Sequence, residues 1–173
     1  MKKFGMFTMA IALLAPIAVL TAGPAGAAGG TTCKTLTGTA TVKPGLGATA
    51  KNQTIVAKAT IGGCTGGGVT KGTSVSTNLT KNGNCTGLAK TGTKSTITET
   101  ITWNTGKTST LAGSTVTGPK TGQATVTLKV SKGVFVGLHA SQVIAFKITK
   151  GACSDKSPVT ALSISVVTPL VIK

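Results

Sequence analysis

Apolar and polar residues alternate with a period of two along much of the chain. The clearest example is 96–103, where Ile97, Ile101 and Trp103 share one face and threonines fill the other. Successive side chains of a strand point to opposite faces of a sheet, so this alternation predicts strands that are buried on one face only. Six stretches show the pattern: 37–42, 54–61, 96–103, 123–130, 143–150 and 159–167.

The same alternation predicts which side chains form the core. The inward faces of two stretches, 54–61 and 123–130, are aliphatic and consist of Ile55, Ala57, Ala59, Ile61, Ala124, Val126, Leu128 and Val130. Turn signals such as Asn104-Thr105-Gly106 separate the stretches about every ten residues. We therefore expect an all-β fold, an antiparallel immunoglobulin-like β-sandwich of about eight or nine strands.

The first 27 residues have the features of a secretory signal peptide. Lys2 and Lys3 precede the apolar stretch 6–20, and Ala25-Gly26-Ala27 fits the small-residue pattern that places cleavage after Ala27. The apolar stretch is too short for a membrane anchor and no second one follows, so we expect no membrane span after signal removal. The expected product is a secreted, extracellular protein, free or associated with the cell wall, in which 28–173 form a single β-sandwich domain.

Four cysteines, Cys33, Cys64, Cys85 and Cys153, lie in the exported part. An even number of cysteines in an oxidising compartment predicts two disulfides, for which three pairings can be drawn. We prefer Cys33–Cys64, because it would close the open end of a hairpin between the antiparallel segments 35–42 and 53–61. The other bridge, Cys85–Cys153, would then tie the middle of the chain to its last third. The cysteine spacings resemble no zinc finger, so we expect no metal site.

The exported part carries sixteen lysines against two acids, Glu99 and Asp155, a net charge of +14. It has no arginine and no tyrosine, and His139 is its single histidine. Most enzymatic mechanisms need paired carboxylates, a histidine relay or a metal cluster, so we expect no enzyme, no catalytic residue and no cofactor. The lysines are scattered, without a basic cluster or an aromatic platform, which argues against specific nucleic-acid binding.

Glu99 is the candidate site residue. It shares a face with Ile97, Ile101 and Trp103, so we predict an acid that points inward. A buried carboxylate is costly unless it is paired or neutral. Three roles stay open: promoting an isopeptide bond between a lysine and an asparagine or aspartate, contacting a ligand in a cleft, or forming an ion pair with a lysine at the sheet edge. A bulge in the strand would instead turn Glu99 outward.

A relay of Ser141, His139 and Asp155 can be written from the loops within 133–155. No nucleophile-elbow pattern of glycines surrounds Ser141, and a histidine and serine this close in sequence seldom meet in the required geometry. We therefore expect His139 to be a solvent-exposed loop residue.

Several features together resemble the uncharacterised small secreted immunoglobulin-like β-proteins of high-GC Gram-positive bacteria. They are the export signal, the Cys-Thr-Gly turns at Cys64 and Cys85, the segment Ile-Thr-Trp-Asn-Thr-Gly-Lys at 101–107 and the threonine-containing last strands. The resemblance implies secretion and an immunoglobulin-like fold, and it brings no active site.

The leading functional hypothesis is a secreted, non-catalytic protein that associates with anionic cell-envelope polymers or a protein partner through a surface rich in lysine and threonine. The lysines could also serve solubility alone. One alternative is a small hydrolase or inhibitor-like module that uses the 133–155 loops. Another is a self-associating structural protein of the cell surface. The pattern leaves the oligomeric state open.

Overall fold

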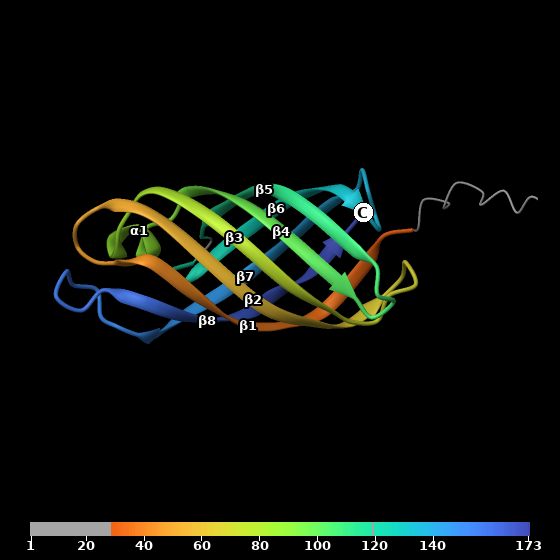
Figure 1. Ribbon diagram of the computed structural model, residues 1–173, viewed down its shortest axis with the longest axis horizontal. Helices are drawn as coiled ribbons and strands as arrows, with labels where there is room; N and C mark the ends of the chain where they lie inside the picture. The colour runs from red at the N-terminus through yellow and green to blue at the C-terminus, as the bar shows by residue number, and fades with distance from the viewer. Residues whose placement is uncertain (1–28, 119) are drawn as a thin grey trace, which may run out of the picture.

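Eight antiparallel strands close into one barrel in the computed structural model, which describes residues 29–118 and 120–173 (Figure 1). The predicted signal peptide, 1–27, lies outside the described residues. The strands are β1 (Thr31–Leu46), β2 (Lys51–Thr65), β3 (Gly72–Gly83), β4 (Lys94–Trp103), β5 (Thr108–Thr117), β6 (Gln123–Gly133), β7 (His139–Lys150) and β8 (Val159–Ile172). A five-residue helix, α1 (Cys85–Ala89), stands between β3 and β4. Among the described residues, no helix is long and apolar enough to cross a membrane.

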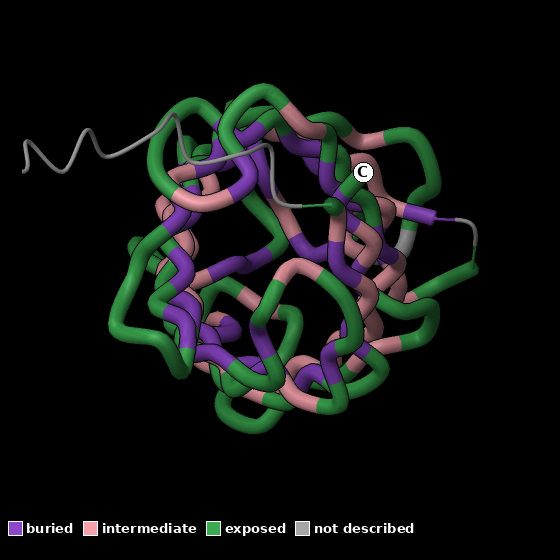
Figure 2. The backbone as a smooth tube through the Cα atoms, turned by 90° about the vertical axis from the view of Figure 1, so that its right-hand side faces the viewer, coloured by how far each residue is buried: buried purple, intermediate pink, exposed green. Residues whose placement is uncertain are grey.

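The strand order is a simple circuit. Each strand pairs with the next one along the chain, and β8 returns to pair with β1, with Thr31 opposite Ile172 and Leu46 opposite Val159. Viewed along its length, the molecule is a ring of strands (Figure 2). The all-β prediction is confirmed, but the immunoglobulin-like β-sandwich is wrong, because a closed circuit has neither two separate sheets nor their free edges.

Long and irregular strands make the closure feasible. The register of β1 against β8 shifts twice, between Cys33 and Thr37 and between Thr41 and Leu46. Such bulges bend a strand and increase its twist, which lets a sheet curl until its edges meet. Alternation reveals which face of a strand is buried, but it is the same in a sandwich and in a barrel. The sequence pattern therefore predicted the faces and missed the closure.

The predicted inward face of β4 is confirmed, since Ile97, Ile101 and Trp103 are all buried. The predicted inward residues of β6 are buried as well. Strand β3, by contrast, was absent from the six alternating stretches. Its inward residues are polar and its outward residues include Val75 and Leu79, which are 48% and 52% exposed. The strand therefore has the reverse of the usual polarity.

One end of the barrel is packed solid. This is the end where the chain enters β1 and leaves β8, and it is filled by the larger hydrophobic core. The rings of Trp103 and Phe135 meet there edge to face, with their centroids 5.6 Å apart. Phe135 has a left-handed backbone, with φ of 67°, in the loop between β6 and β7. A non-glycine residue adopts this conformation at some cost, and here the buried ring closes the end of the barrel.

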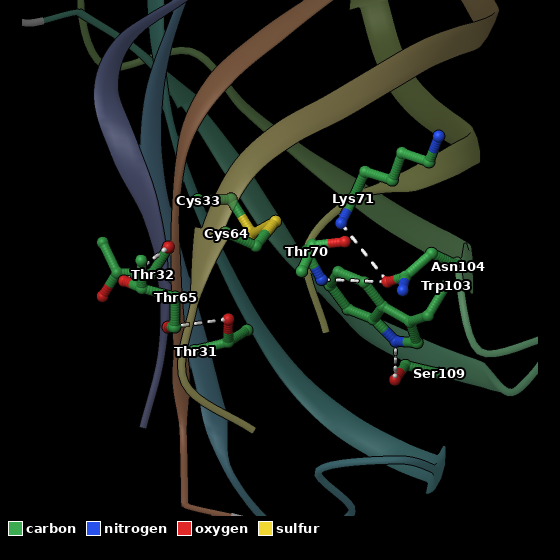
Figure 3. Close-up of a disulfide and its surroundings, with 10 residues drawn as sticks. All are labelled: Thr31, Thr32, Cys33, Cys64, Thr65, Thr70, Lys71, Trp103, Asn104 and Ser109. Atoms are coloured by element: carbon green, nitrogen blue, oxygen red, sulfur yellow. Dashed lines mark hydrogen bonds between the residues drawn. A yellow bond between two sulfur atoms is a disulfide. The ribbon is translucent and has the colours of Figure 1, made fainter. Parts of the chain in front are cut away.

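Polar contacts and a disulfide secure this closed end (Figure 3). The indole Nε1 of Trp103 donates to Ser109 Oγ at 2.8 Å, and that hydroxyl donates to the carbonyl of Val134 at 2.6 Å. The side chain of Asn104 accepts from the backbone N–H of Thr70 at 2.9 Å, which joins the β4–β5 hairpin to the neighbouring loop. The Cys33–Cys64 bridge links β1 to β2, as the preferred pairing predicted.

The opposite end is covered by α1 and the loops around it (Figure 1). The second disulfide, Cys85–Cys153, is again the preferred one, and it ties the start of α1 to the 151–158 loop. Asp155 in that loop accepts hydrogen bonds from the backbone N–H and the hydroxyl of Thr49, at 2.9 and 2.6 Å. These contacts connect three loops that are far apart in sequence into a single cover.

Candidate functional site

The barrel interior holds a cavity of about 110 Å³ beneath α1. Eight-stranded barrels are just wide enough for side chains to fill them or for one small ligand to enter. This barrel does both, since the half beneath Trp103 and Phe135 is packed and the half beneath α1 is hollow. Leu46, Leu88 and Phe146 are among the residues that line the cavity near the covered end.

Two chemically different walls face each other across the cavity. One is almost wholly apolar and comes from β1, β2, β6, β7 and β8. Its residues are Ala40, Leu46, Ile55, Ala57, Ala124, Ile144, Phe146, Leu162 and Ile164. The other comes from β3, β4 and β5 and is mainly polar. We call it the polar wall, and its residues are Ser76, Asn78, Thr80, Ser95 and Thr115. In a circuit of eight strands, β4 lies opposite β8, so the two walls oppose each other.

Hydrogen bonds connect the side chains of the polar wall. The amide Nδ2 of Asn78 donates to Thr115 Oγ1 at 2.8 Å, and the hydroxyls of Thr80 and Ser95 are 2.7 Å apart. Thr80 also donates to Asn78 Oδ1 at 3.4 Å, which joins the two pairs into one network. Three strands thus supply a continuous polar surface inside the barrel.

Glu99 lies deeper, at a second cavity of about 40 Å³. The two cavities adjoin, because five residues line both: Ala57, Ser76, Ile97, Ile144 and Ile164. Only 5% of the surface of Glu99 is exposed. Burial raises the pKa of its carboxyl above the ordinary value, while a hydrogen bond from Ser74 acts in the opposite direction. The inward orientation predicted for Glu99 is therefore what the structure has.

The side-chain amide of Gln142, on β7, borders the same deeper cavity. Gln142 is 7% exposed, and its Oε1 atom is buried without a hydrogen-bond partner. A buried acceptor that lacks a donor is destabilising by about 1–3 kcal/mol, which makes such atoms uncommon in folded proteins. Glu99, Ser74 and Gln142 together form the deep polar site.

Within the part of the chain that the structure describes, the surroundings of Glu99 contain no basic side chain. No lysine lines either cavity among the described residues, so neither an isopeptide bond nor an ion pair with a sheet-edge lysine forms at Glu99. No histidine, cysteine, aspartate or second glutamate lines them either. The site can hold a polar group in an otherwise apolar space, and it lacks the paired carboxylates used in acid–base catalysis.

The Ser141–His139–Asp155 relay does not form. Ser141 and His139 lie at the start of β7, beside the closed end, whereas Asp155 lies in the loop over the hollow end. Asp155 is occupied by its hydrogen bonds to Thr49, which lower the pKa of its carboxyl. His139 is exposed, and its backbone pairs with that of Lys173. Among the described residues, no group of three potential metal ligands is present.

Sequence reasoning missed the polar wall and Gln142. The signal was present in 74–80, where Ser74, Ser76, Asn78 and Thr80 alternate with Val75, Thr77 and Leu79. The usual rule would turn Val75 and Leu79 inward, which is the wrong face. Only the register of β3 against β4, with Ser76 opposite Glu99, decides the orientation.

The charged side chains on the exterior of the barrel are almost all basic. All sixteen lysines between Lys34 and Lys173 are exposed. Of the two acidic side chains in this part, Glu99 is inside the barrel, which leaves Asp155 as the single acidic side chain at the described surface.

The chain matches no protein-family model, and no curated protein is significantly similar to it in sequence.

Proposed function

We propose that this protein binds a small, largely apolar molecule inside its barrel and holds one polar group of that molecule against inward polar side chains, those of the polar wall or of the deep polar site that adjoins it. The observation that carries the proposal is the reversed polarity of β3. Asn78 and its neighbours on β3 face inward, while Val75 and Leu79 are exposed. Polar groups inside an apolar core are costly, and departures from the usual pattern concentrate at functional sites.

The size of the cavity supports a small ligand. An engineered cavity of about 150 Å³ is known to hold benzene. The cavity of about 110 Å³ in this barrel is of similar size, and the deeper cavity adjoins it. One ring or a short branched chain therefore matches the space, whereas a long lipid does not. Binding and release without chemistry fit a site with one buried acid and no second titratable partner.

A cavity-filling variant tests the proposal. Ala57 lines both cavities, so Ala57→Leu should fill much of the space. We expect toluene and benzyl alcohol to shift the backbone amide resonances of the cavity residues in the wild-type protein, and to shift none of them in the variant. Ala112→Leu is the matched control, because Ala112 is exposed on the outer face of β5. If Ala57→Leu binds both probes as the wild type does, the proposal is wrong.

The lysine-covered exterior favours a second candidate function, association with anionic cell-envelope polymers. A surface with sixteen exposed lysines and one acidic side chain attracts anions over distances of about 10 Å at ordinary salt. Sodium chloride washes of the cell wall of a producing culture test it. Release between about 0.1 and 0.5 M salt would support electrostatic association, because the screening length shortens over that range. Retention at high salt, or free protein in the medium at low salt, would contradict it.

A further inference from the structure

The deep polar site contains one hydrogen-bond acceptor that no donor of the barrel satisfies, next to a buried carboxyl. Gln142 Oε1 has no partner, and the Glu99 carboxyl receives a side-chain hydrogen bond from Ser74. The two groups come from β7 and β4, which lie on different sides of the barrel, and both border the cavity of about 40 Å³. A group placed between them would need at least two donors.

The barrel interior also lacks a positive charge to pair with Glu99. Every lysine from Lys34 onward is exposed, His139 is exposed, and the chain has no arginine. A buried carboxylate without a cation is strongly disfavoured, which is why such a group keeps its proton. A ligand with an ammonium group would supply both a cation for Glu99 and a hydrogen-bond donor for Gln142. An ammonium group carries one positive charge and three donors.

We propose that the ligand of the barrel is a small primary amine, with its ammonium group between Glu99 and Gln142 and its apolar body, of about one ring, in the larger cavity. This inference rests on the proposed function, since it names the chemical class of the molecule held in the barrel. An alcohol fits less well, because one hydroxyl donates a single hydrogen bond and brings no charge.

Binding of an amine should change the number of protons bound to the protein. When Glu99 holds its proton and the amine arrives as an ammonium ion, forming the ion pair releases one proton from Glu99 to the solvent. Affinity therefore rises with pH until Glu99 is ionised in the free protein. The other groups facing Glu99 do not titrate. They are Leu36 on β1, Ala57 and Ala59 on β2, Ser74 and Ser76 on β3, Ile97 on β4, Leu111 on β5, Val126 on β6, Gln142 and Ile144 on β7 and Ile164 on β8.

The basic exterior opposes the approach of a cation but does not prevent its binding. Charges at the surface are screened within about 8–10 Å at physiological salt. The ion pair inside the barrel is in direct contact and is much less screened. Raising the salt concentration should accordingly speed the entry of an amine rather than weaken its final contact.

Three probes of similar shape test the inference: benzylamine, benzyl alcohol and toluene, titrated into the disulfide-bonded protein by calorimetry at pH 7. We expect benzylamine to bind about tenfold more tightly than benzyl alcohol, or better, since a hydrogen bond to a charged group adds about 1.5–3 kcal/mol. The benzylamine enthalpy should also change with the ionisation enthalpy of the buffer at each pH at which Glu99 keeps its proton in the free protein, because a proton is then released. This second readout needs no variant.

Glu99→Gln supplies the matched variant, as it keeps the shape of the side chain and removes its charge. In this variant we expect the preference for benzylamine and the buffer dependence to disappear, while toluene binds as in the wild type. If benzyl alcohol and toluene bind to the wild type and benzylamine has no advantage, the amine inference is overturned and the proposed function stands. If the preference survives in Glu99→Gln, the inference is also overturned. If none of the three probes binds, both proposals fail.

Discussion

The side-chain amide of Asn78 on β3 reaches past β4 to donate a hydrogen bond of 2.8 Å to the hydroxyl of Thr115 on β5. β4 lies between the two strands, so this contact crosses its inner surface. It converts polar residues from separate strands into one hydrogen-bonded surface, and the cavity has a different chemistry on its two sides as a result.

The polar wall should determine which probes bind. Replacing Asn78 by leucine removes the link to Thr115 and makes the wall more apolar. We expect benzyl alcohol to bind several-fold more weakly and toluene to bind as well as before or better, because one hydrogen bond contributes about 0.5–1.5 kcal/mol. Resonance titrations measure both affinities. Thr98→Leu, on the exposed face of β4, is the control. Equal losses for the two probes would argue against a specific polar contact.

The pH dependence of the free energy of unfolding should reflect the titration of Glu99. Burial holds its pKa above the ordinary value of 4.5, so the folded protein retains a proton that the unfolded chain releases. The contribution of Glu99 to the free energy of unfolding should therefore be largest below pH 4.5, fall as pH rises from there to the raised pKa, and then level off. Denaturant unfolding across this range should show the fall in the wild type and not in Glu99→Gln.

Asp155 provides a control of opposite sign. Its pKa is lowered by hydrogen bonds from Thr49, so its contribution is present at neutral pH and is lost as pH falls through the lowered value. Asp155→Asn should therefore abolish this loss of stability in acid and leave the decline in the free energy of unfolding above pH 4.5 intact. A wild-type stability that does not vary between pH 5 and pH 8 would contradict the burial of an unpaired Glu99.

The closed end should depend on Ser109. Its hydroxyl accepts from the Trp103 indole and donates to the Val134 carbonyl, so Ser109→Ala removes the partner of a buried indole N–H and of a part-buried carbonyl. We expect a loss of about 1–3 kcal/mol in the free energy of unfolding. Trp103 is the only tryptophan, so its fluorescence follows this end alone. Ser114→Ala, on the outer face of β5, should have little effect. An unchanged stability in Ser109→Ala would show that these hydrogen bonds do not stabilise the closed end.

The two disulfides should act differently on ligand exchange. Cys85–Cys153 holds the cover over the cavity, whereas Cys33–Cys64 lies at the packed end. Replacing either pair by alanine should lower the free energy of unfolding by about 2–4 kcal/mol. Only loss of Cys85–Cys153 should speed the entry and release of toluene, as measured by exchange broadening of resonances. Equal exchange rates in the two double variants would show that α1 does not limit access.

Local sequence patterns determined most of the strands, several of their inward faces and one disulfide. Alternation located six of the eight strands, identified the inward faces of β2, β4 and β6, and placed Glu99 among inward residues. Antiparallel pairing of the first two strands was enough to favour Cys33–Cys64, since it brings these cysteines opposite each other in the register. These results depend on the two-residue period of a strand and on neighbouring pairing, both of which can be read within short stretches.

The remaining features depend on contacts between distant parts of the chain. Closure depends on β8 meeting β1, a contact between the two ends of the chain that no local pattern specifies. The polarity of β3 was reversed because its register places Ser76 opposite the inward Glu99, which turns Val75 and Leu79 outward. Gln142 became part of a site because β7 lies across the barrel from the polar wall. The sequence of a strand shows that its two faces differ in polarity. Whether a face borders the core, a cavity or the solvent depends on how all eight strands are arranged.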